Sequence, residues 1–354
     1  MRVLRLSTFL DYGGIESKMV KLSKVEQDRF DFYFCSIGKG GAAESEIIAI
    51  GGKTVCLNES YKIGSMRTFL KVAELIKSIK PDVVHCSGAE AVFYGVLAGR
   101  LLNVKIVVAE EIGIPKPSRI TTRVFRFVYS LAHKAAAESA LVCNELSRIY
   151  SVNPEKINVI HNFIDCSAID TSRYSRSDFL KLLSVCRLEP VKNIEGVLKA
   201  LSILRDQGYR FVYHILGDGS DSERLKEVVR DLALSEKVIF HGYVEDTSRH
   251  YLDADLFLMN SYSEGFSNSL LEAMNHNIPV ISTKVGGAVD VIENEVNGWL
   301  VNTDDVPMLI DTLKGFYSLS VPERLMIGKN GGDHVRSSFS SESHMAALSS
   351  LYAV

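Results

Sequence analysis

Strand-like runs of residues alternate with helix-like runs along almost the whole chain, and this alternation constrains the fold more than any other feature of the sequence. It favours parallel sheets with helices on both faces, because every parallel connection must cross back over one face of its sheet. Helical patterns include residues 66–79, which Lys80-Pro81 ends, and residues 91–102. The strand-like runs are residues 3–7, 32–37, 83–86, 105–109, 141–143, 158–161, 182–186, 211–216, 238–241, 256–259, 279–282 and 299–301.

The chain is long enough for two domains of this kind. Its 354 residues exceed the usual size of a single domain, so each half is expected to bury a core of its own. The polar stretch at residues 165–178, which contains four serines, is the predicted linker. We therefore predict an α/β protein with a doubly wound, Rossmann-like domain at residues 1–165 and a second one at residues 166–335.

The charge is distributed unevenly between these two halves. Residues 1–165 carry 22 Lys and Arg against 17 Asp and Glu, whereas the rest of the chain carries 18 against 26. A basic first half is expected to face something anionic. The total charge of −3 and the lack of a recognition motif argue against nucleic acid as a partner. No apolar run is long enough to span a bilayer, and no leader pattern is visible, so we expect a cytoplasmic protein.

Ligands of doubly wound sheets bind beyond the carboxyl ends of the strands, so the loops that follow the predicted strands hold the candidate site residues. After the first strand comes Asp11-Tyr-Gly-Gly-Ile-Glu16, in which Gly13 and Gly14 allow close backbone approach to an anion. A plain tight turn explains the same pattern equally well. The segment is not GxGxxG, which disfavours a nicotinamide cofactor.

Two further loops follow strands of the second half. Arg187 and Lys192 bracket a loop that contains Pro190, and Asn193 is placed to cap the next helix. Two cations at a strand end suit a diphosphate, although charges on an ordinary surface loop give the same pattern. Gly217-Asp-Gly219 is predicted to be a tight turn before a helix that Asp218 or Ser220 caps, with a backbone contact from Gly217 to ligand as the alternative.

The most informative segment is Ser261-Tyr-Ser-Glu-Gly-Phe-Ser-Asn-Ser-Leu-Leu-Glu-Ala-Met274. Ser267 or Asn268 is expected to cap a helix whose first turn offers free amides and a positive dipole end to a phosphate. Glu272 lies about one turn inside this helix, and Glu264 precedes it. Carboxylates accept hydrogen bonds from pairs of sugar hydroxyls, so both suit a ribose or a hexose. Otherwise Glu272 is an exposed helix charge and Glu264 a loop acid.

In their order and spacing these motifs resemble the family-4 group of retaining glycosyltransferases with the GT-B fold. The resemblance covers nearly the whole chain. It includes the Gly13-Gly14 loop, the Arg187 and Lys192 pair, and the Glu264 and Glu272 pair, and it extends to the segments Asn162-Phe-Ile-Asp165, Gly217–Gly219, Val285-Gly-Gly287 and Asn297-Gly-Trp-Leu-Val301. It implies two domains that face a central cleft, with residues 336–354 forming a helix that packs back on the first domain.

The resemblance also implies roles for the matching residues. Arg187 and Lys192 would bind the donor diphosphate and stabilise the leaving nucleoside diphosphate, and the Gly13-Gly14 loop would close on the phosphates. Glu272 would hold the ribose and Glu264 the transferred sugar. Gly265, Phe266, Ser267 and Asn268 lie in the same motif and would contact the donor near the sugar. UDP is the expected nucleotide, GDP the alternative, and no metal or other cofactor is implied.

One position departs from the family pattern. Many relatives carry a histidine after the strand that corresponds to residues 105–109, whereas this chain has Val108-Ala-Glu-Glu-Ile-Gly113. Glu111 falls where that histidine is expected. It either takes over the orientation of donor or acceptor as a catalytic residue, or Glu110 and Glu111 are both loop acids. His85, which ends an apolar strand, is interpreted as a core or wall histidine.

The segment from Lys116 to Lys134 contains Arg119, Arg123 and Arg126 and no acid between its ends. Apolar residues recur beside them at helical spacing: Ile120, Val124, Phe127 and Leu131. A basic amphipathic helix can lie on an anionic membrane surface, whereas a helix packed on its own domain gives the same spacing. Since relatives act on lipid-linked acceptors, both interpretations stay open, and the protein is expected either free in the cytoplasm or peripheral on the inner face of the membrane.

Together with these features, the resemblance implies a retaining transferase. It would move a hexose or N-acetylhexosamine from a UDP-sugar to a saccharide acceptor, lipid-linked, in surface polysaccharide biosynthesis. The alternatives are a GT-B-like sugar-nucleotide epimerase and a catalytically inactive scaffold subunit that binds a sugar nucleotide.

Overall fold

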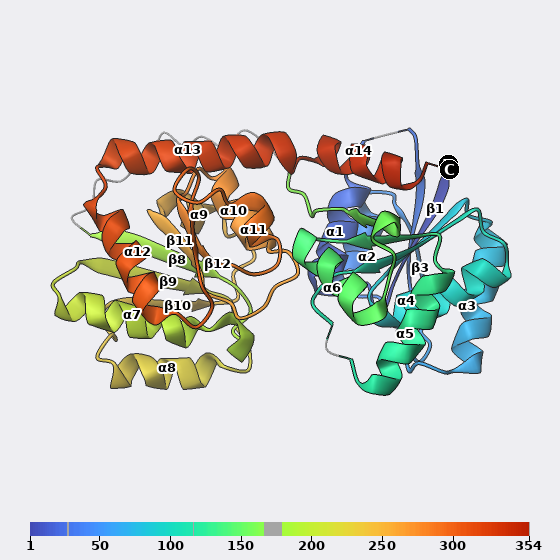
Figure 1. Ribbon diagram of the computed structural model, residues 1–354, viewed down its shortest axis with the longest axis horizontal. Coiled ribbons are helices and arrows are strands. Elements are labelled where there is room, and N and C mark those ends of the chain that lie inside the picture. The colour runs from blue at the N-terminus through green and yellow to red at the C-terminus, as the bar shows by residue number, and fades with distance from the viewer. Residues whose placement is uncertain (27, 116, 166–178, 354) are drawn as a thin grey trace. The chain divides into compact units, whose positions relative to one another are not determined.

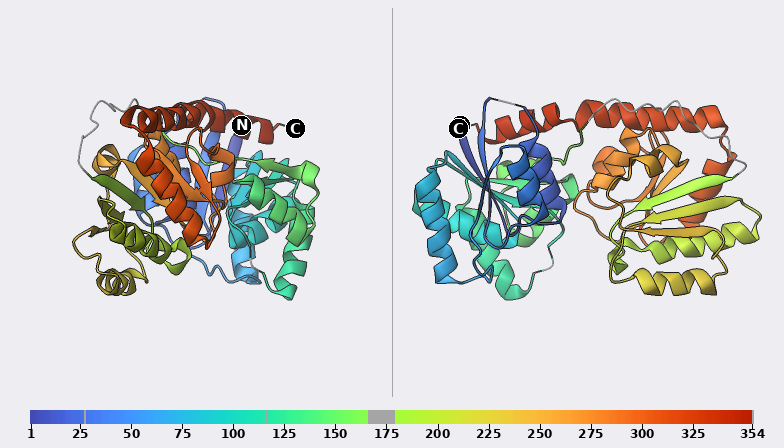
Figure 2. Two further views of the ribbon diagram at one scale, coloured as in Figure 1. Left: turned by 60° about the vertical axis from the view of Figure 1, so that its left-hand side comes forward. Right: turned by 180° about the vertical axis from the view of Figure 1, so that it is seen from behind.

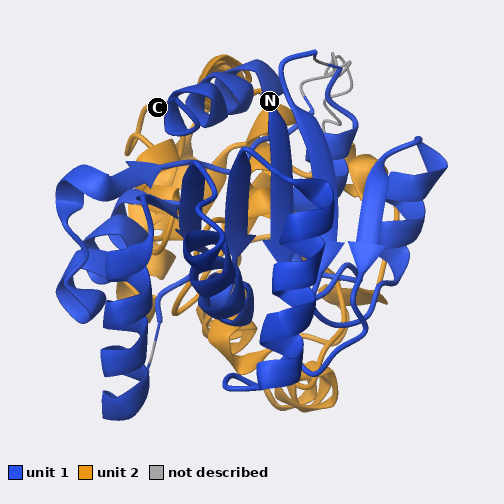
Figure 3. Cartoon of the chain, turned by 90° about the vertical axis from the view of Figure 1, so that its right-hand side faces the viewer, with its two compact units in different colours: residues 1–165, 341–354 blue, residues 166–340 orange. Residues whose placement is uncertain are grey.

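The computed structural model describes residues 1–353 except residues 27, 116 and 166–178, so the predicted linker beyond Asp165 lies outside the described residues. The chain divides into two compact units (Figure 3). Unit 1 consists of Met1–Asp165 and Ser341–Val354, and unit 2 of Cys166–Ser340. The second unit therefore ends a few residues later than residue 335, because helix α13 (Val321–Ser338) continues past that point. Within the described residues, no helix combines the length and the apolar character needed to cross a membrane.

Unit 1 is built on a parallel sheet of seven strands in the order β3-β2-β1-β4-β5-β6-β7. Its elements are coloured from blue to green in Figure 1, except the red helix α14. The strand order reverses between β1 and β4, which makes this the switch point where doubly wound sheets bind ligands. The strands are β1 (Arg2–Ser7), β2 (Asp31–Ser36), β3 (Lys53–Cys56), β4 (Val83–Ser87), β5 (Ile106–Glu111), β6 (Lys134–Ala137) and β7 (Ile157–Val159).

Helices cover both faces of this sheet. One core lies between the sheet and α3 to α6, and the other between the sheet and α1, α2 and the last helix, α14. The helices are α1 (Gly14–Ser23), α2 (Ala42–Ala49), α3 (Met66–Ile79), α4 (Ala89–Leu101), α5 (Arg119–Leu131), α6 (Ala140–Tyr150) and α14 (Ser341–Leu351), with a 3₁₀ turn at Pro154–Lys156. Leu348, Leu351 and Tyr352 belong to the second core, so the end of the chain is part of unit 1.

Unit 2 repeats the plan with a parallel sheet of six strands in the order β10-β9-β8-β11-β12-β13, and its switch point lies between β8 and β11. Helices α7, α8 and α12 share one core with the sheet, and α9, α10 and α13 lie on the opposite face (Figure 2). The strands are β8 (Leu180–Val185), β9 (Phe211–Leu216), β10 (Val238–Gly242), β11 (Leu256–Met259), β12 (Val280–Thr283) and β13 (Trp299–Val301). The helices are α7 (Ile194–Asp206), α8 (Ser222–Asp231), α9 (Ser248–Asp253), α10 (Asn268–Asn275), α11 (Ala288–Val291), α12 (Val306–Ser318) and α13, with a 3₁₀ turn at Pro190–Lys192.

One predicted strand of unit 1 is wrong, and one strand of the same region was missed. Residues 141–143 form part of helix α6 and not a strand, because the Ser139 side chain accepts a hydrogen bond from the Val142 amide and starts the helix there. The strand of this region is β6, which was missed because its sequence Lys-Ala-Ala-Ala has little strand propensity. Buried positions in a crowded sheet override that propensity, since Ala135, Ala136 and Ala137 are almost completely buried.

Candidate functional site

The loops that follow β8 and β11 lie on either side of the switch point in unit 2 and bring two predicted site residues into contact. Lys192 Nζ, after β8, lies 2.6 Å from Glu264 Oε1, after β11. The Ser261 hydroxyl donates a second hydrogen bond to the same carboxylate oxygen, also at 2.6 Å. Both members of the ion pair are mostly buried. Glu264 is therefore held in one orientation beyond the carboxyl end of β11.

Two hydrogen bonds to backbone carbonyls join the same two loops. The Tyr262 amide donates to the Val191 carbonyl at 2.8 Å, and the Asn260 side chain donates to the Asn193 carbonyl at 3.2 Å. Asn193 caps α7 as predicted, because its side chain accepts from the Gly196 amide. These hydrogen bonds fix the positions of the two loops at the carboxyl ends of β8 and β11.

Arg187 lies in the loop after β8, where an anion from solvent can reach it. Its side chain is exposed, and among the described residues it makes no ion pair. Lys192, in contrast, is neutralised in part by Glu264. A planar guanidinium that has no internal partner is suited to bind two oxygens of a phosphate group.

The Gly217–Gly219 turn approaches the loop of Arg187 closely. Gly217 has a φ of 121°, and a Cβ atom there would lie 1.9 Å from the Cys186 carbonyl oxygen, so no other residue fits. The prediction that Asp218 or Ser220 caps α8 is wrong. Asp221 occupies the cap position, and Asp218 instead accepts hydrogen bonds from the Gly219 amide and the Ser222 hydroxyl.

The residues after Glu264 lead into α10 as predicted. Ser267 caps the helix by accepting a hydrogen bond from the Leu270 amide, and Asn268 is the first residue of the helix. Phe266 is buried against Phe339, and the Gly265 carbonyl accepts from the Gly287 amide at 2.9 Å. The positive end of the α10 dipole thus follows directly on the Glu264 loop.

Glu272 lies one turn inside α10, where it accepts a hydrogen bond of 3.2 Å from the Tyr251 hydroxyl. Tyr251 is almost completely buried in α9 and stacks on His276. Its phenol fixes one carboxylate oxygen of Glu272. Neither Tyr251 nor Ser261 was recognised in the sequence, because a hydrogen bond between distant segments leaves no local pattern.

In unit 1, Gly13 and Gly14 lie at the start of α1, directly after the switch-point strand β1. Gly13 is the N-cap and Gly14 the first residue of the helix. A Cβ atom at Gly13 would lie 2.2 Å from Glu16 Oε2, so the Glu16 side chain folds back over the helix start. Asp11, Tyr12 and Gly13 are among the residues that line a hollow of about 230 Å³ in unit 1.

Glu110 and Glu111 both belong to strand β5, so the interpretation of the two as loop acids is wrong. Neighbouring residues of a strand point to opposite faces, and the two carboxylates accordingly have different surroundings. Glu110 is buried and lies 2.8 Å from Lys18 Nζ and 3.2 Å from Arg5 Nη2. Burial alone raises its pKa, but the charges of Lys18, His85 and Arg5 outweigh this and hold the pKa well below its ordinary value.

This buried cluster extends across unit 1. Lys18 also contacts Glu138 at 2.6 Å, and the hydroxyl of Tyr352 lies 2.7 Å from His85 Nδ1. His85 is completely buried, in agreement with its interpretation as a core histidine. The sequence contains a hint of this cluster, because Arg5 lies inside the apolar run Val3-Leu-Arg-Leu6. A charged residue within a strand that is buried on both faces requires a buried partner of opposite charge, and this hint was not recognised.

Glu111 has few partners by comparison. Its carboxylate accepts a hydrogen bond of 3.3 Å from the Tyr129 hydroxyl of α5. Burial raises the pKa of Glu111 to about 7, and Glu138 adds to the effect. This carboxyl group therefore changes its protonation state close to neutral pH, as a general acid or base does.

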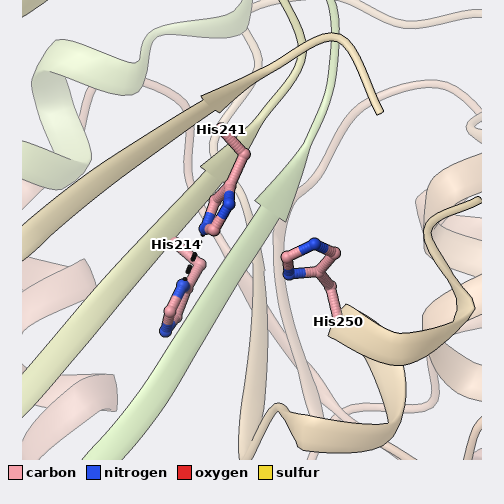
Figure 4. Close-up of side chains that lie close together, drawn as sticks. All are labelled: His214, His241 and His250. Carbon is pink, nitrogen blue, oxygen red and sulfur yellow. Dashed lines mark hydrogen bonds between the residues drawn. The ribbon is translucent and has the colours of Figure 1, made fainter. Parts of the chain in front are cut away.

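Three histidines of unit 2 that are far apart in the sequence come together in the fold. His214 of β9, His241 of β10 and His250 of α9 converge, and one nitrogen of each ring lies within 4.8 Å of the others (Figure 4). Their separation in the sequence conceals this, because β9 and β10 are neighbours only in the folded sheet.

Comparison with solved structures places this architecture among the GT-B glycosyltransferases. The structure of Anabaena HepE in complex with UDP matches with a TM-score of 0.85 and 20% identity, and the match covers 99% of both chains. At this identity the likeness establishes the fold: two Rossmann-like α/β domains of the GT-B type.

Family models identify the particular group. The model of glycosyl transferases group 1 matches residues 169–334, and that of glycosyltransferase family 4 matches residues 12–168. The chain therefore belongs to the family-4, group 1 glycosyltransferases.

Two curated relatives have more specific names. The amylovoran biosynthesis glycosyltransferase AmsK of Erwinia amylovora is 29% identical over 238 residues, which are 61% of this chain and 57% of AmsK. The chain thus spans little more than half the length of that relative. The UDP-Gal:α-D-GlcNAc-diphosphoundecaprenol α-1,3-galactosyltransferase of Escherichia coli is 27% identical over 282 residues, 73% of this chain and 72% of the enzyme.

Proposed function

We propose that the protein is a retaining glycosyltransferase that moves a hexose or N-acetylhexosamine from a UDP-sugar to a lipid-linked saccharide in surface polysaccharide biosynthesis. The observation that carries the proposal is the ion pair of Lys192 and Glu264 at the switch point of unit 2, together with the exposed Arg187 in the same loop after β8. The two cations suit the diphosphate of a nucleotide-sugar, and the fixed carboxylate suits its hydroxyl groups.

In this proposal Arg187 and Lys192 bind the donor diphosphate and stabilise the charge that grows on it as the glycosidic bond breaks. The start of α10 adds its dipole to the same charge. Glu272, oriented by Tyr251, binds the ribose hydroxyls. The Gly13-Gly14 loop of unit 1 contributes backbone amides to the phosphates.

Glu264 binds hydroxyls of the transferred sugar, with backbone contacts from Gly265, Phe266, Ser267, Asn268 and the Gly217 turn nearby. The acceptor hydroxyl attacks from the face that the diphosphate leaves, and the departing phosphate oxygen takes its proton, so the anomeric configuration is retained. Glu111 takes the place of the usual histidine and orients donor or acceptor. No metal takes part in the transfer, because cations of the protein neutralise the leaving group.

A lipid-linked acceptor is supported by the name of the diphosphoundecaprenol galactosyltransferase and by the exposed face of α5. Lys116 lies outside the described residues, but Arg119, Arg123 and Arg126 are all exposed. The apolar stripe predicted to pack on the domain is only partly buried, since Ile120 is 76% and Phe127 59% exposed. Phe125, Val128 and Tyr129 form the buried face instead. We propose that the exposed face lies on the anionic inner surface of the membrane.

The proposal is tested first by calorimetric titration and thermal shift with UDP, GDP, ADP and NAD. Wild type is expected to bind UDP selectively, and Arg187→Ala to weaken UDP binding at least about tenfold, since charge-assisted hydrogen bonds are worth roughly 1.5–3 kcal/mol. Arg230→Ala is the matched control, because Arg230 is an exposed arginine of α8 in the same unit. Failure of all four ligands to bind, or binding of NAD alone, contradicts the proposal.

The two alternatives are separated by a second experiment with Glu264→Gln. A transferase loses most of its transfer to acceptor in this variant, while an inactive scaffold subunit assembles with its partner unchanged. An epimerase converts the sugar nucleotide without acceptor. Glu227→Gln, an exposed acid of α8, controls for the loss of one negative charge.

A further inference from the structure

Three histidines of unit 2 come together from separate elements at the edge of the sheet (Figure 4). His214 lies near the middle of β9, His241 lies where the register of β10 shifts, and His250 lies in α9. His214 Nδ1 and His241 Nε2 are 2.9 Å apart, and the ring centroid of His250 is 4.5 Å from that of His241. All three rings are half-buried, so a small ion from solvent can reach them.

The geometry is close to that of a metal site. In a tetrahedral zinc site with Zn–N bonds of about 2.0–2.1 Å, ligand nitrogens are roughly 3.3 Å apart. The nitrogens of His214 and His241 are slightly closer than this, and those of the whole group lie within 4.8 Å. Small rotations of the rings therefore suffice to place one nitrogen of each ring around a single ion. The ion would replace the proton of the hydrogen bond between His214 and His241.

The surroundings of two of the rings, those of His214 and His241, shift their pKa values. Burial, together with the neighbouring imidazoles, lowers the pKa of His214, and burial and His250 lower that of His241.

We propose that His214, His241 and His250 form a site for one divalent transition-metal ion of the zinc class, with the fourth position left to water. Imidazole is a preferred ligand of Zn²⁺, Ni²⁺ and Cu²⁺ and a poor match for Mg²⁺ or Ca²⁺. The site is distinct from the reacting groups of the proposed transfer, which involves no metal.

The position of the site gives the ion a structural effect on the donor site. His250 lies directly before Tyr251, whose hydroxyl fixes Glu272, and His241 directly precedes Gly242, whose carbonyl accepts from the Gly217 amide at 2.7 Å. A metal ion that joins β9, β10 and α9 would hold these contacts together. The expected effect is therefore a stabilised unit 2 with a more rigid donor site. This consequence rests on the proposed function, but binding of the metal does not.

The experiment uses the full chain without an affinity tag, since a histidine tag binds the same ions. Calorimetric titration with Zn²⁺ alone is expected to show about one site per chain, and Co²⁺ alone is expected to give the visible absorption of a four-coordinate ion. His250→Ala is the main variant, because His250 is not part of the 2.9 Å hydrogen bond and alanine suits a helix. It should weaken Zn²⁺ binding at least about tenfold, the lower limit seen even for outer-shell changes.

His334→Ala, a half-buried histidine of α13 outside the cluster, is the matched control and should bind Zn²⁺ as wild type does. His250→Gln, with its far-UV spectrum and metal-free melting temperature compared to wild type, separates loss of a ligand from loss of fold. The proposal is overturned if wild type shows no Zn²⁺ site, or if His250→Ala and His250→Gln bind Zn²⁺ as tightly as wild type. Because the readout is metal binding, it is independent of whether the protein transfers sugar.

Discussion

At the scale of single residues, Glu110 and Glu111 show how strongly the two faces of one strand differ. Glu110 is surrounded by Lys18, Arg5 and His85 and stays charged in a buried cluster. Glu111 has the hydroxyl of Tyr129 and backbone amides as partners, and no cation of the described residues pairs with it. The first carboxylate therefore belongs to the architecture of unit 1, and the second is available for chemistry.

Glu111→Gln should change how stability depends on pH. The pKa of Glu111 is raised to about 7 in the folded protein, so between roughly pH 5 and 8 the folded state holds a proton that the unfolded state has released. The free energy of unfolding of wild type is expected to fall over this range. Relative to Glu111→Gln, which cannot titrate, the fall should be about 1–2 kcal/mol once partial exposure is allowed for.

Urea unfolding at several pH values measures this difference, with the fully exposed Glu74→Gln as control. The lowered pKa values of the buried histidines are common to all variants and cancel in the comparison. Parallel curves for wild type and Glu111→Gln would show that Glu111 does not titrate near neutrality.

At the scale of elements, the sequence predicts strands where apolar runs end abruptly at turns. The ranges of β9, β11 and β13 agree residue for residue with the predicted runs, and α3 does too, because Ser65 caps it and Pro81 follows it. Strand β6 could not be predicted, since its residues have little strand propensity and acquire their structure from neighbours in the sheet. Strand β3 was missed because it has only four residues and shows no clear apolar run.

In the candidate site, too, only the residues that form a local sequence pattern could be predicted. Loops after β8 and β11 could be singled out, because glycines, cations and carboxylates after a strand form a local pattern. Their partners could not, since Ser261, Tyr251 and Lys18 are ordinary residues until folding brings them to Glu264, Glu272 and Glu110. The three converging histidines belong to this second group.

At the scale of elements, we predict that helix α5 binds anionic membranes. Its exposed face combines Arg119, Arg123 and Arg126 with Ile120 and Phe127. Each basic side chain near an anionic bilayer is worth about 1 kcal/mol, so Arg123→Gln together with Arg126→Gln should lower the affinity for phosphatidylglycerol vesicles by roughly tenfold or more. Co-sedimentation with these vesicles and with neutral phosphatidylcholine vesicles measures the effect.

The matched control replaces two basic residues of α8, Lys226→Gln with Arg230→Gln, which removes the same charge from unit 2. If both double variants lose equal affinity, the attraction comes from total charge and not from α5. Equal sedimentation of wild type with anionic and neutral vesicles would contradict an electrostatic contact of any kind.

At the scale of the whole molecule, the chain begins and ends in the same unit. Helix α14 is the last element, yet it completes the core that β1, α1 and α2 begin. Its Leu348 and Leu351 are buried, and the Tyr352 hydroxyl lies 2.7 Å from His85 Nδ1 and 3.3 Å from Arg5 Nη1. Unit 1 therefore cannot complete its core until the whole of unit 2 has been synthesised.

A chain that ends at Ser340 should consequently lose stability in unit 1 while unit 2 keeps its own. Burial of Leu348, Leu351 and Tyr352 contributes roughly 1.5–3 kcal/mol each, and the loss of Tyr352 also removes a hydrogen bond from the buried Arg5. Hydrogen exchange followed by mass spectrometry resolves the two units within one chain. Peptides of β1 and β4 should exchange much faster than in wild type, and peptides of β8 and β11 at the same rate.

Tyr352→Phe, which removes only the hydroxyl, should give a smaller change of about 1–2 kcal/mol in the free energy of unfolding, confined to unit 1. Uniformly faster exchange in both units would mean that unit 2 also depends on α14, because the two units then unfold as one cooperative body.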